Sequence, residues 1–153
     1  MLRTLVLIGA VAVAAPAHAD VGLGLFVGEP TGLDLKIGIS PRSGLDLVFG
    51  WDTYRDNRDQ YGHITYLATL LVGHGESVNV PLRLGVGAAF YGDSSFSNGT
   101  NVAVRVPLEL GLRFRTAPVE IYGEIALKLT FVDANNDKDD VDLDGGIGFR
   151  IYF

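Results

Sequence analysis

The C-terminal stretch 141–153 alternates strictly between two kinds of side chain. Its odd positions are apolar or glycine and end on Phe153, whereas its even positions are charged, small or, at Tyr152, amphipathic. Successive side chains of a β-strand point to opposite faces, so a period of two indicates a strand between an apolar and a polar environment. A helix and a strand buried on both faces have other patterns. We therefore expect a sheet whose two faces meet unlike surroundings.

Seven earlier segments alternate in a similar way, and each is bounded by turn residues such as proline and glycine. The eight segments are 21–28, 33–39, 45–54, 63–72, 80–91, 101–115, 119–131 and 141–153. Consecutive hairpins predict an all-β fold, an eight-stranded antiparallel up-and-down transmembrane β-barrel. Tilted membrane strands need about 9 to 11 residues, which most segments reach, although the first two are short. Pro107 lies mid-segment without an N–H donor, so a bulge or a bound water is expected there.

Residues 1–19 have the pattern of a removable leader. Arg3 precedes the apolar run 5–15, and small residues then stand where cleavage after Ala19 requires them. This three-part order is typical of a secretory signal peptide. The prediction divides the chain into a signal peptide, 1–19, and an outer-membrane β-barrel domain, 20–153. An N-terminal anchor or buried helix is the alternative.

The charge balance and the lack of cysteine each exclude some classes of partner and of chemistry. The formal net charge is −6, and loss of Arg3 with the leader makes it −7. An acidic balance argues against nucleic acid and anionic lipid surfaces as partners. With no cysteine, thiol catalysis, thiolate metal sites and lipidation on cysteine are excluded.

The polar face is expected to point into the barrel. It carries most of the strand glycines, which a crowded interior needs beside long charged side chains. Its acids and bases are nearly equal in number, as an enclosed network requires, because an unpaired buried charge costs several kcal/mol. The apolar face has no charged residue, as lipid contact demands. The predicted interior charge network consists of Asp34, Lys36, Asp46, Asp52, Arg83, Arg105, Glu109, Arg113, Glu120, Glu124, Lys128, Asp142, Asp144 and Arg150.

The connections between segments predict an orientation. With the N-terminus in the periplasm, the long polar loops that start near residues 55, 92 and 133 lie outside, and the shorter turns near 40, 73 and 116 lie inside. The predicted interfacial aromatic residues are Trp51, Phe90 and Phe131 near the outer strand ends, and Phe114 and Phe153 near the inner ends. The same alternation also fits a soluble, lipocalin-like barrel with the apolar face around a ligand cavity.

The chain ending resembles that of outer-membrane barrel proteins, whose last strand alternates apolar residues up to a terminal Phe read by the assembly machinery. The stretches 28–33 (GEPTGL), 105–108 (RVPL), 117–118 (AP) and 142–153 are similar to those of a largely uncharacterised family of small barrels from spirochaetes and other bacteria. More broadly, the chain resembles the OmpA and OmpX barrels, over essentially all of its length after residue 19.

This resemblance implies location in the cell outer membrane. The implied partners are outer-membrane lipids and lipopolysaccharide, the barrel assembly machinery through the C-terminal strand, and an extracellular protein ligand of unknown identity. No cofactor and no metal are expected.

The sequence gives little evidence for an ion path, a metal site or a catalytic site. Eight strands leave room only for side chains, which favours a salt-bridged filling over a proton or small-ion path. The loop from Asp133 begins like a calcium loop but has Lys138 where glycine is required. His63 could face Asp52 and the serines Ser94, Ser95 and Ser97, as in a lipid-modifying enzyme, yet no nucleophile motif accompanies them. We expect a structural or surface-interaction role without enzymatic activity, in which the outer loops carry any recognition.

Overall fold

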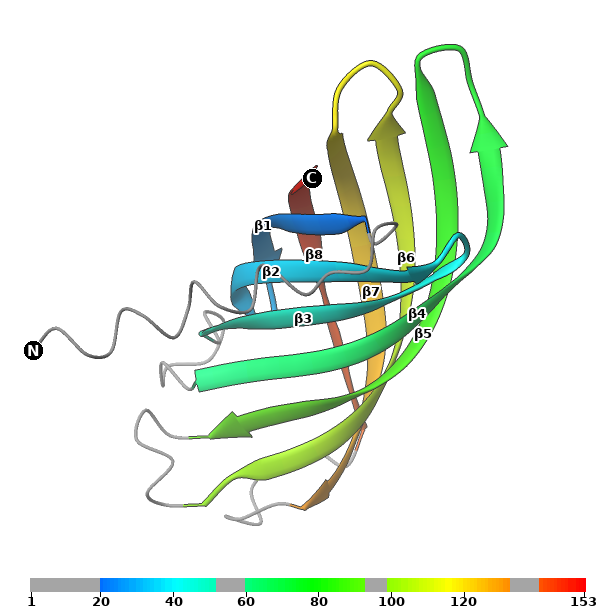
Figure 1. Cartoon of the computed structure of the whole chain (residues 1–153). Coiled ribbons are helices and arrows are strands. Elements are labelled where there is room, and N and C mark those ends of the chain that lie inside the picture. Colours follow the sequence, from blue (N-terminus) through cyan, green and yellow to red (C-terminus); the bar gives the residue numbers. More distant parts are fainter. Residues whose placement is uncertain (1–19, 52–59, 93–98, 133–140) are drawn as a thin grey trace, which may run out of the picture.

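The computed structural model describes residues 20–51, 60–92, 99–132 and 141–153 (Figure 1). Eight strands follow one another: β1 Val21–Gly28, β2 Thr31–Ser40, β3 Ser43–Trp51, β4 Gln60–His74, β5 Val78–Gly92, β6 Asn101–Phe114, β7 Val119–Val132 and β8 Val141–Tyr152. Each strand pairs antiparallel with its neighbour in sequence, and β1 pairs with β8. The predicted all-β, eight-stranded, up-and-down barrel is confirmed as a closed barrel.

The strand bounds differ from the predicted ones mainly where polar residues pair. β2 begins at Thr31 because the connection from β1 is only Glu29 and Pro30, and the Thr31 hydroxyl donates to the Gly28 carbonyl over 3.0 Å. β4 begins at Gln60 and not at His63, since residues 60–62 pair with β3 on one side and β5 on the other. Residues 52–54, predicted to extend the third strand, lie outside the described residues.

The two faces of the strands have the predicted directions along most of the barrel. Large apolar side chains point outward, with Val27 62 % and Ile125 64 % exposed. Charged side chains point inward, and Asp34 and Arg150 are fully buried. The described residues therefore form a barrel with an apolar outside and a charged inside, the reverse of the soluble alternative.

A bulge at Leu70 reverses the alternation near the end of β4. Thr69 pairs with Arg83, but Leu71 pairs with Leu82, so one extra residue stands in β4. The sequence pattern predicts Leu71 on the polar face, and this prediction is wrong, because the bulge turns its side chain outward to 55 % exposure.

Pro107 is accommodated without the expected bulge. It pairs with Ala126 of β7, and the β5–β6 register is the same on both sides of it. The β5–β6 pairing is instead interrupted opposite Pro107, and again beside Pro81 of β5. Both prolines face inward and are buried, so each missing donor weakens the same seam of the barrel.

The barrel has two unlike ends. At the turn end lie Asp20, Phe153 and the short connections 41–42, 75–77 and 115–118. At the loop end, which takes its name from the longer connecting segments in the sequence, lie the connection 29–30 and the strand ends Trp51, Gln60, Gly92, Asn101, Val132 and Val141. β4 to β7 have 14 or 15 residues, whereas β1 to β3 have 8 to 10. The β4–β5 and β6–β7 hairpins therefore project beyond the rest of the turn end (Figure 1).

Among the described residues, no helix has the length and apolar character needed to cross a bilayer. The predicted signal peptide, 1–19, lies outside these residues, so its boundary at Ala19 stays a prediction.

Candidate functional site

The interior of the barrel is the largest polar site in the described chain. Alternation brings charged side chains from six strands, β2, β3 and β5 to β8, into one enclosed space, where an unpaired charge would be costly. The buried acids are Asp34, Asp46, Glu109, Glu120, Glu124 and Asp144, and the buried bases are Lys36, Arg83, Arg105, Lys128 and Arg150.

Arg150 is the hub of this network. Its Nε donates to Asp34 Oδ2 over 2.5 Å, its Nη1 to Glu109 Oε2 over 2.9 Å and its Nη2 to Asp46 Oδ1 over 2.6 Å. The guanidinium carbon also lies 3.6 Å from the ring centroid of Tyr122. A planar fork with several fixed donors can serve three carboxylates at once, which an ammonium group cannot do in the same geometry.

A second group lies toward the turn end. Arg83 donates to Glu120, and its Nη1 also donates to Glu109 Oε1 over 2.5 Å. Lys36 Nζ lies 3.4 Å from the same Glu109 oxygen. The Tyr152 hydroxyl donates to Glu120 Oε2 over 2.6 Å. Glu109 thus joins this group to the Arg150 hub.

A third group lies toward the loop end. Lys128 Nζ donates to Asp144 Oδ1 over 2.7 Å, and the Tyr61 hydroxyl donates to the other Asp144 oxygen. The ammonium group also lies 5.4 Å from the Tyr61 ring centroid and 5.0 Å from that of Tyr91. The two rings are stacked with centroids 5.7 Å apart. Aromatic faces and a carboxylate together stabilise the buried cation.

Arg105 stands opposite Lys128 in the β6–β7 ladder but has a carboxylate partner of its own. Its Nη2 donates to Glu124 Oε1 over 2.6 Å, and its Nη1 donates to Thr65 Oγ1 over 3.2 Å. Nη1 also lies 3.1 Å from His63 Nδ1, which must accept because a guanidinium has only donors. Within the described residues, His63 Nε2 and Arg105 Nε have no hydrogen-bond partner.

Glycines allow side chains on alternate strands to meet. Gly148 of β8 pairs with both Phe26 of β1 and Tyr122 of β7, and the two rings stack above it with centroids 5.9 Å apart. A Cβ on Gly148 would overlap the Tyr122 ring. Two further pairs meet across a glycine in this way, Asp34 and Arg150 across Gly24, and Thr65 and Arg105 across Gly87.

The carboxylates of Asp46, Glu109 and Glu124 come close enough to resemble a metal site. One oxygen of each lies within 4.8 Å of the others. Each carboxylate is already bound by a guanidinium, Asp46 and Glu109 by Arg150, and Glu124 by Arg105. These guanidiniums supply the positive charge that a cation would bring. We therefore assign no metal to the trio.

Two residues of the predicted network are partly exposed, and a third is not among the described residues. Arg113 stands at the turn end with its side chain 32 % exposed, where Nη2 is 2.8 Å from Asp20 Oδ2. Asp142 is partly exposed toward the loop end, 3.5 Å from Lys128 Nζ. Asp52 lies outside the described residues.

The predicted interfacial aromatic residues all point outward. Exposure is 54 % for Trp51, 43 % for Phe90 and 71 % for Phe131 at the loop end, and 37 % for Phe114 and 80 % for Phe153 at the turn end.

Three network tyrosines have no role predicted from the sequence. Tyr61 falls in the predicted polar loop that starts near residue 55, and Tyr122 and Tyr152 fall on the polar face of the predicted segments 119–131 and 141–153. The Tyr122 hydroxyl donates to Asp34 Oδ2 over 2.6 Å, so it shares an acceptor with Arg150. An inward position in a strand could have indicated this role, since the hydroxyl of a buried tyrosine needs a hydrogen-bond partner, which the charged neighbours supply.

The catalytic alternative, with His63 near Asp52 and loop serines, stays a prediction. His63 itself is buried inside the barrel at 4 % exposure. Its suggested partners Asp52, Ser94, Ser95 and Ser97 lie outside the described residues. Asp133, the start of the calcium-like loop, also lies outside the described residues. Asp144, at the end of that pattern, already binds Lys128 and Tyr61.

Large side chains fill most of the barrel interior. The largest fully buried side chains, which include Arg105, Arg150, Tyr61 and Tyr122, stand across the lumen. A small cavity of about 70 Å³ remains at the turn end, lined in part by Lys36 and Arg83. Such a filled cross-section is expected of a narrow eight-stranded barrel.

Comparison of the chain with protein-family models, with curated proteins and with solved structures finds no match in any of the three. The resemblance to outer-membrane barrels therefore rests on the residues of the chain alone.

Proposed function

We propose that this protein is an integral outer-membrane β-barrel with a structural or surface-interaction role. One observation supports the proposal most: large apolar side chains cover the outside, while 14 polar or charged side chains of the described residues are buried inside. In water this distribution would be unfavourable on both counts, because large exposed apolar patches associate and buried charges need compensation. In a bilayer the apolar wall meets hydrocarbon.

The backbone hydrogen bonding supports the same location. A membrane leaves no water for unpaired backbone groups, so a sheet can cross it only as a closed barrel. Here β1 pairs with β8 over seven residue pairs, from Gly22 with Tyr152 to Gly28 with Gly146, and no described strand of the wall lacks two neighbours. The aromatic residues at both strand ends fit interfacial girdles.

The filled interior favours a role carried by surfaces. Buried ion pairs occupy the lumen, so recognition falls to the connections at the loop end, which we orient outward. Outer-membrane lipids and lipopolysaccharide would surround the wall, β8 would be read by the barrel assembly machinery, and an extracellular protein ligand is open. No enzymatic activity and no cofactor are part of the proposal.

The first experiment compares mobility in SDS of the mature chain with and without boiling, after refolding in detergent. A compact band that shifts only on boiling is expected. A protein that is soluble without detergent and shows no shift would overturn the proposal.

A matched pair of variants tests lipid contact directly. Ile125 lies mid-strand in β7 and Val132 ends the same strand, and both point outward. Lysine at a midplane position of a membrane barrel costs about 2–4 kcal/mol, but only about 0–1 kcal/mol near the interface. Ile125→Lys should therefore reduce folding into vesicles far more than Val132→Lys. Equal folding of the two variants would contradict contact of this wall with hydrocarbon.

A further inference from the structure

Two arginines differ from every other described base. The six remaining lysines and arginines each form an ion pair with a carboxylate: Lys36, Arg83, Arg105, Arg113, Lys128 and Arg150. Arg42 and Arg115 form none with a carboxylate of the described residues, and both are exposed. Both stand at the turn end, Arg42 in the β2–β3 connection and Arg115 in the β6–β7 connection.

Backbone contacts hold both arginines against the β4–β5 hairpin. Arg42 Nη2 donates to the Leu70 carbonyl over 2.9 Å, and Arg115 Nη1 donates to the Gly75 carbonyl over 3.2 Å. Next to Arg42, the Ser40 and Ser43 hydroxyls lie 2.8 Å apart. A guanidinium has five N–H donors, so one carbonyl fixes each group and leaves most of its donors for a further acceptor.

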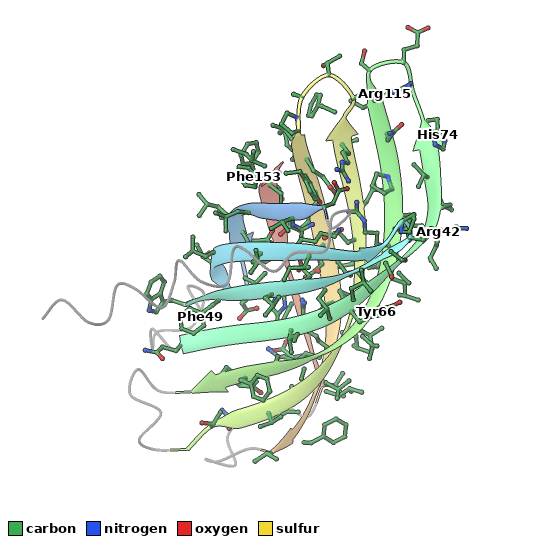
Figure 2. The ribbon with its side chains drawn as sticks, viewed as in Figure 1. Arg42, Phe49, Tyr66, His74, Arg115 and Phe153 are labelled. Atoms are coloured by element: carbon green, nitrogen blue, oxygen red, sulfur yellow. The ribbon has the colours of Figure 1, made fainter. Side chains whose placement is uncertain are left out.

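The apolar wall continues to the level of these arginines. Tyr66, Leu71 and Phe114 point outward with exposures of 44 %, 55 % and 37 %. Figure 2 shows Arg42 and Arg115 on the side of the molecule away from Phe49. Guanidiniums at the margin of an apolar wall lie where a bilayer changes from hydrocarbon to head groups.

The charge of the chain is unevenly distributed between the two ends. By sequence, the connections 52–59, 93–98 and 133–140 at the loop end hold eight acids and three bases. The turn end has Arg42, Arg113 and Arg115 against Asp20 and Glu76 among its described side chains. The net negative charge of the chain argues against binding to anionic lipid surfaces. The described side chains of the turn end, however, include more bases than acids, so this argument does not exclude such binding there.

We propose that Arg42 and Arg115 bind the phosphate groups of anionic phospholipids in the leaflet at the turn end. This inference rests on the proposed function, since it needs the barrel to stand in a bilayer. Guanidinium and phosphate match in a bidentate, charge-assisted geometry, and no carboxylate among the described residues pairs with these two groups.

The test measures urea unfolding midpoints of the protein folded into phosphatidylcholine vesicles, with and without added phosphatidylglycerol. At low salt, phosphatidylglycerol should raise the midpoint of the unsubstituted protein, and high salt should remove the shift. The double variant Arg42→Gln with Arg115→Gln should lose at least half of the shift. Glu76→Gln, which also changes charge at this end, should keep it. The readout is a difference between two vesicles, so a general loss of stability cancels.

The outcomes separate this inference from the proposed function. A double variant that keeps the full shift would overturn lipid binding by these arginines, as would an unsubstituted protein that shows no shift. Inorganic phosphate added to phosphatidylcholine vesicles should not raise the midpoint; an equal rise would assign the site to free phosphate. If the unsubstituted protein gives no boiling-dependent band in either vesicle, the membrane barrel itself is wrong.

Discussion

Arg150 Nε donates to Asp34 Oδ2 over 2.5 Å although 116 residues separate the two in sequence. They are not on adjacent strands, since β1 lies between β2 and β8. Gly24 of β1 pairs with both residues, and it has no side chain to stand between them. The ion pair thus crosses the seam where the barrel closes and connects three strands.

Arg150→Met should destabilise the folded barrel by about 3–5 kcal/mol, because Asp34, Asp46 and Glu109 would each lose a buried partner. Unfolding in urea, followed by Trp51 fluorescence in detergent micelles, measures the change. Arg113→Met is the control, since its pair with Asp20 is partly exposed and contributes at most about 1 kcal/mol. Similar losses for the two variants would show that the interior pairs are not the stronger ones.

Gly148→Ala should cost about 1–3 kcal/mol by overpacking, because the added methyl group would push the Tyr122 ring off Arg150 and Asp34. Gly123→Ala is the matched control in the adjacent strand. Its Cβ would meet no heavy atom within 4 Å, and the substitution should be neutral or stabilise by about 0.4–1 kcal/mol. The same urea unfolding measurement applies. A Gly148→Ala variant as stable as the Gly123→Ala variant would contradict the crowding described for the interior.

Hydrogen exchange should be faster along the interrupted part of the β5–β6 seam. Pairing between β5 and β6 is missing opposite Pro107 but continuous at Ala88 and Val104. A net hydrogen bond contributes about 1 kcal/mol, so the Gly85 amide beside the gap should be roughly fivefold less protected than the Ala89 amide, which points to the same neighbouring strand. Amide exchange by NMR in micelles gives these rates. Uniform protection along both strands would mean that the gap is closed in solution.

Trp51, the one tryptophan of the chain, should report a shallow position at the loop end. In vesicles, lipids brominated near the head group should quench its fluorescence more than lipids brominated deep in the chain. The double variant Trp51→Phe with Phe49→Trp moves the probe two residues along the same outward face, about 6–7 Å. Deep bromines should quench this variant more. A probe that aqueous quenchers reach equally well at both positions would argue against burial of β3 in lipid.

Alternation alone was sufficient to predict the number of strands, their order and most inward-facing charges, because period two is a local property of the chain. Val21–Gly28 matches its predicted bounds, and Asp34 and Arg150 point inward as expected. The prediction that Leu71 lies on the polar face was wrong, because the bulge at Leu70 depends on pairing with β5 and cannot be recognised from the sequence alternation.

The partners within the interior could not be predicted. Which base meets which acid depends on the register of strands that are distant in sequence, and on glycines that stand between them. Tyr61 was assigned to a loop because residues 55–62 are polar, yet pairing with β3 and β5 brings it into the barrel against Asp144. Of the bulge or bound water expected at Pro107, the bulge is absent, because the β5–β6 register is the same on both sides and the missing donor leaves only a gap in that ladder.

The ion pair across Gly24 also has a consequence for the order of folding. Hairpins from β1 to β7 can form from neighbouring segments, but the guanidinium shared by Asp34, Asp46 and Glu109 comes from β8, the last strand to be synthesised. Contacts between such distant segments form late, because a long loop must close first. Until β8 arrives, these three carboxylates have no common counter-charge, which favours leaving the open sheet in water. Arrival of one arginine would then make closure of the wall and burial of its charges a single cooperative event.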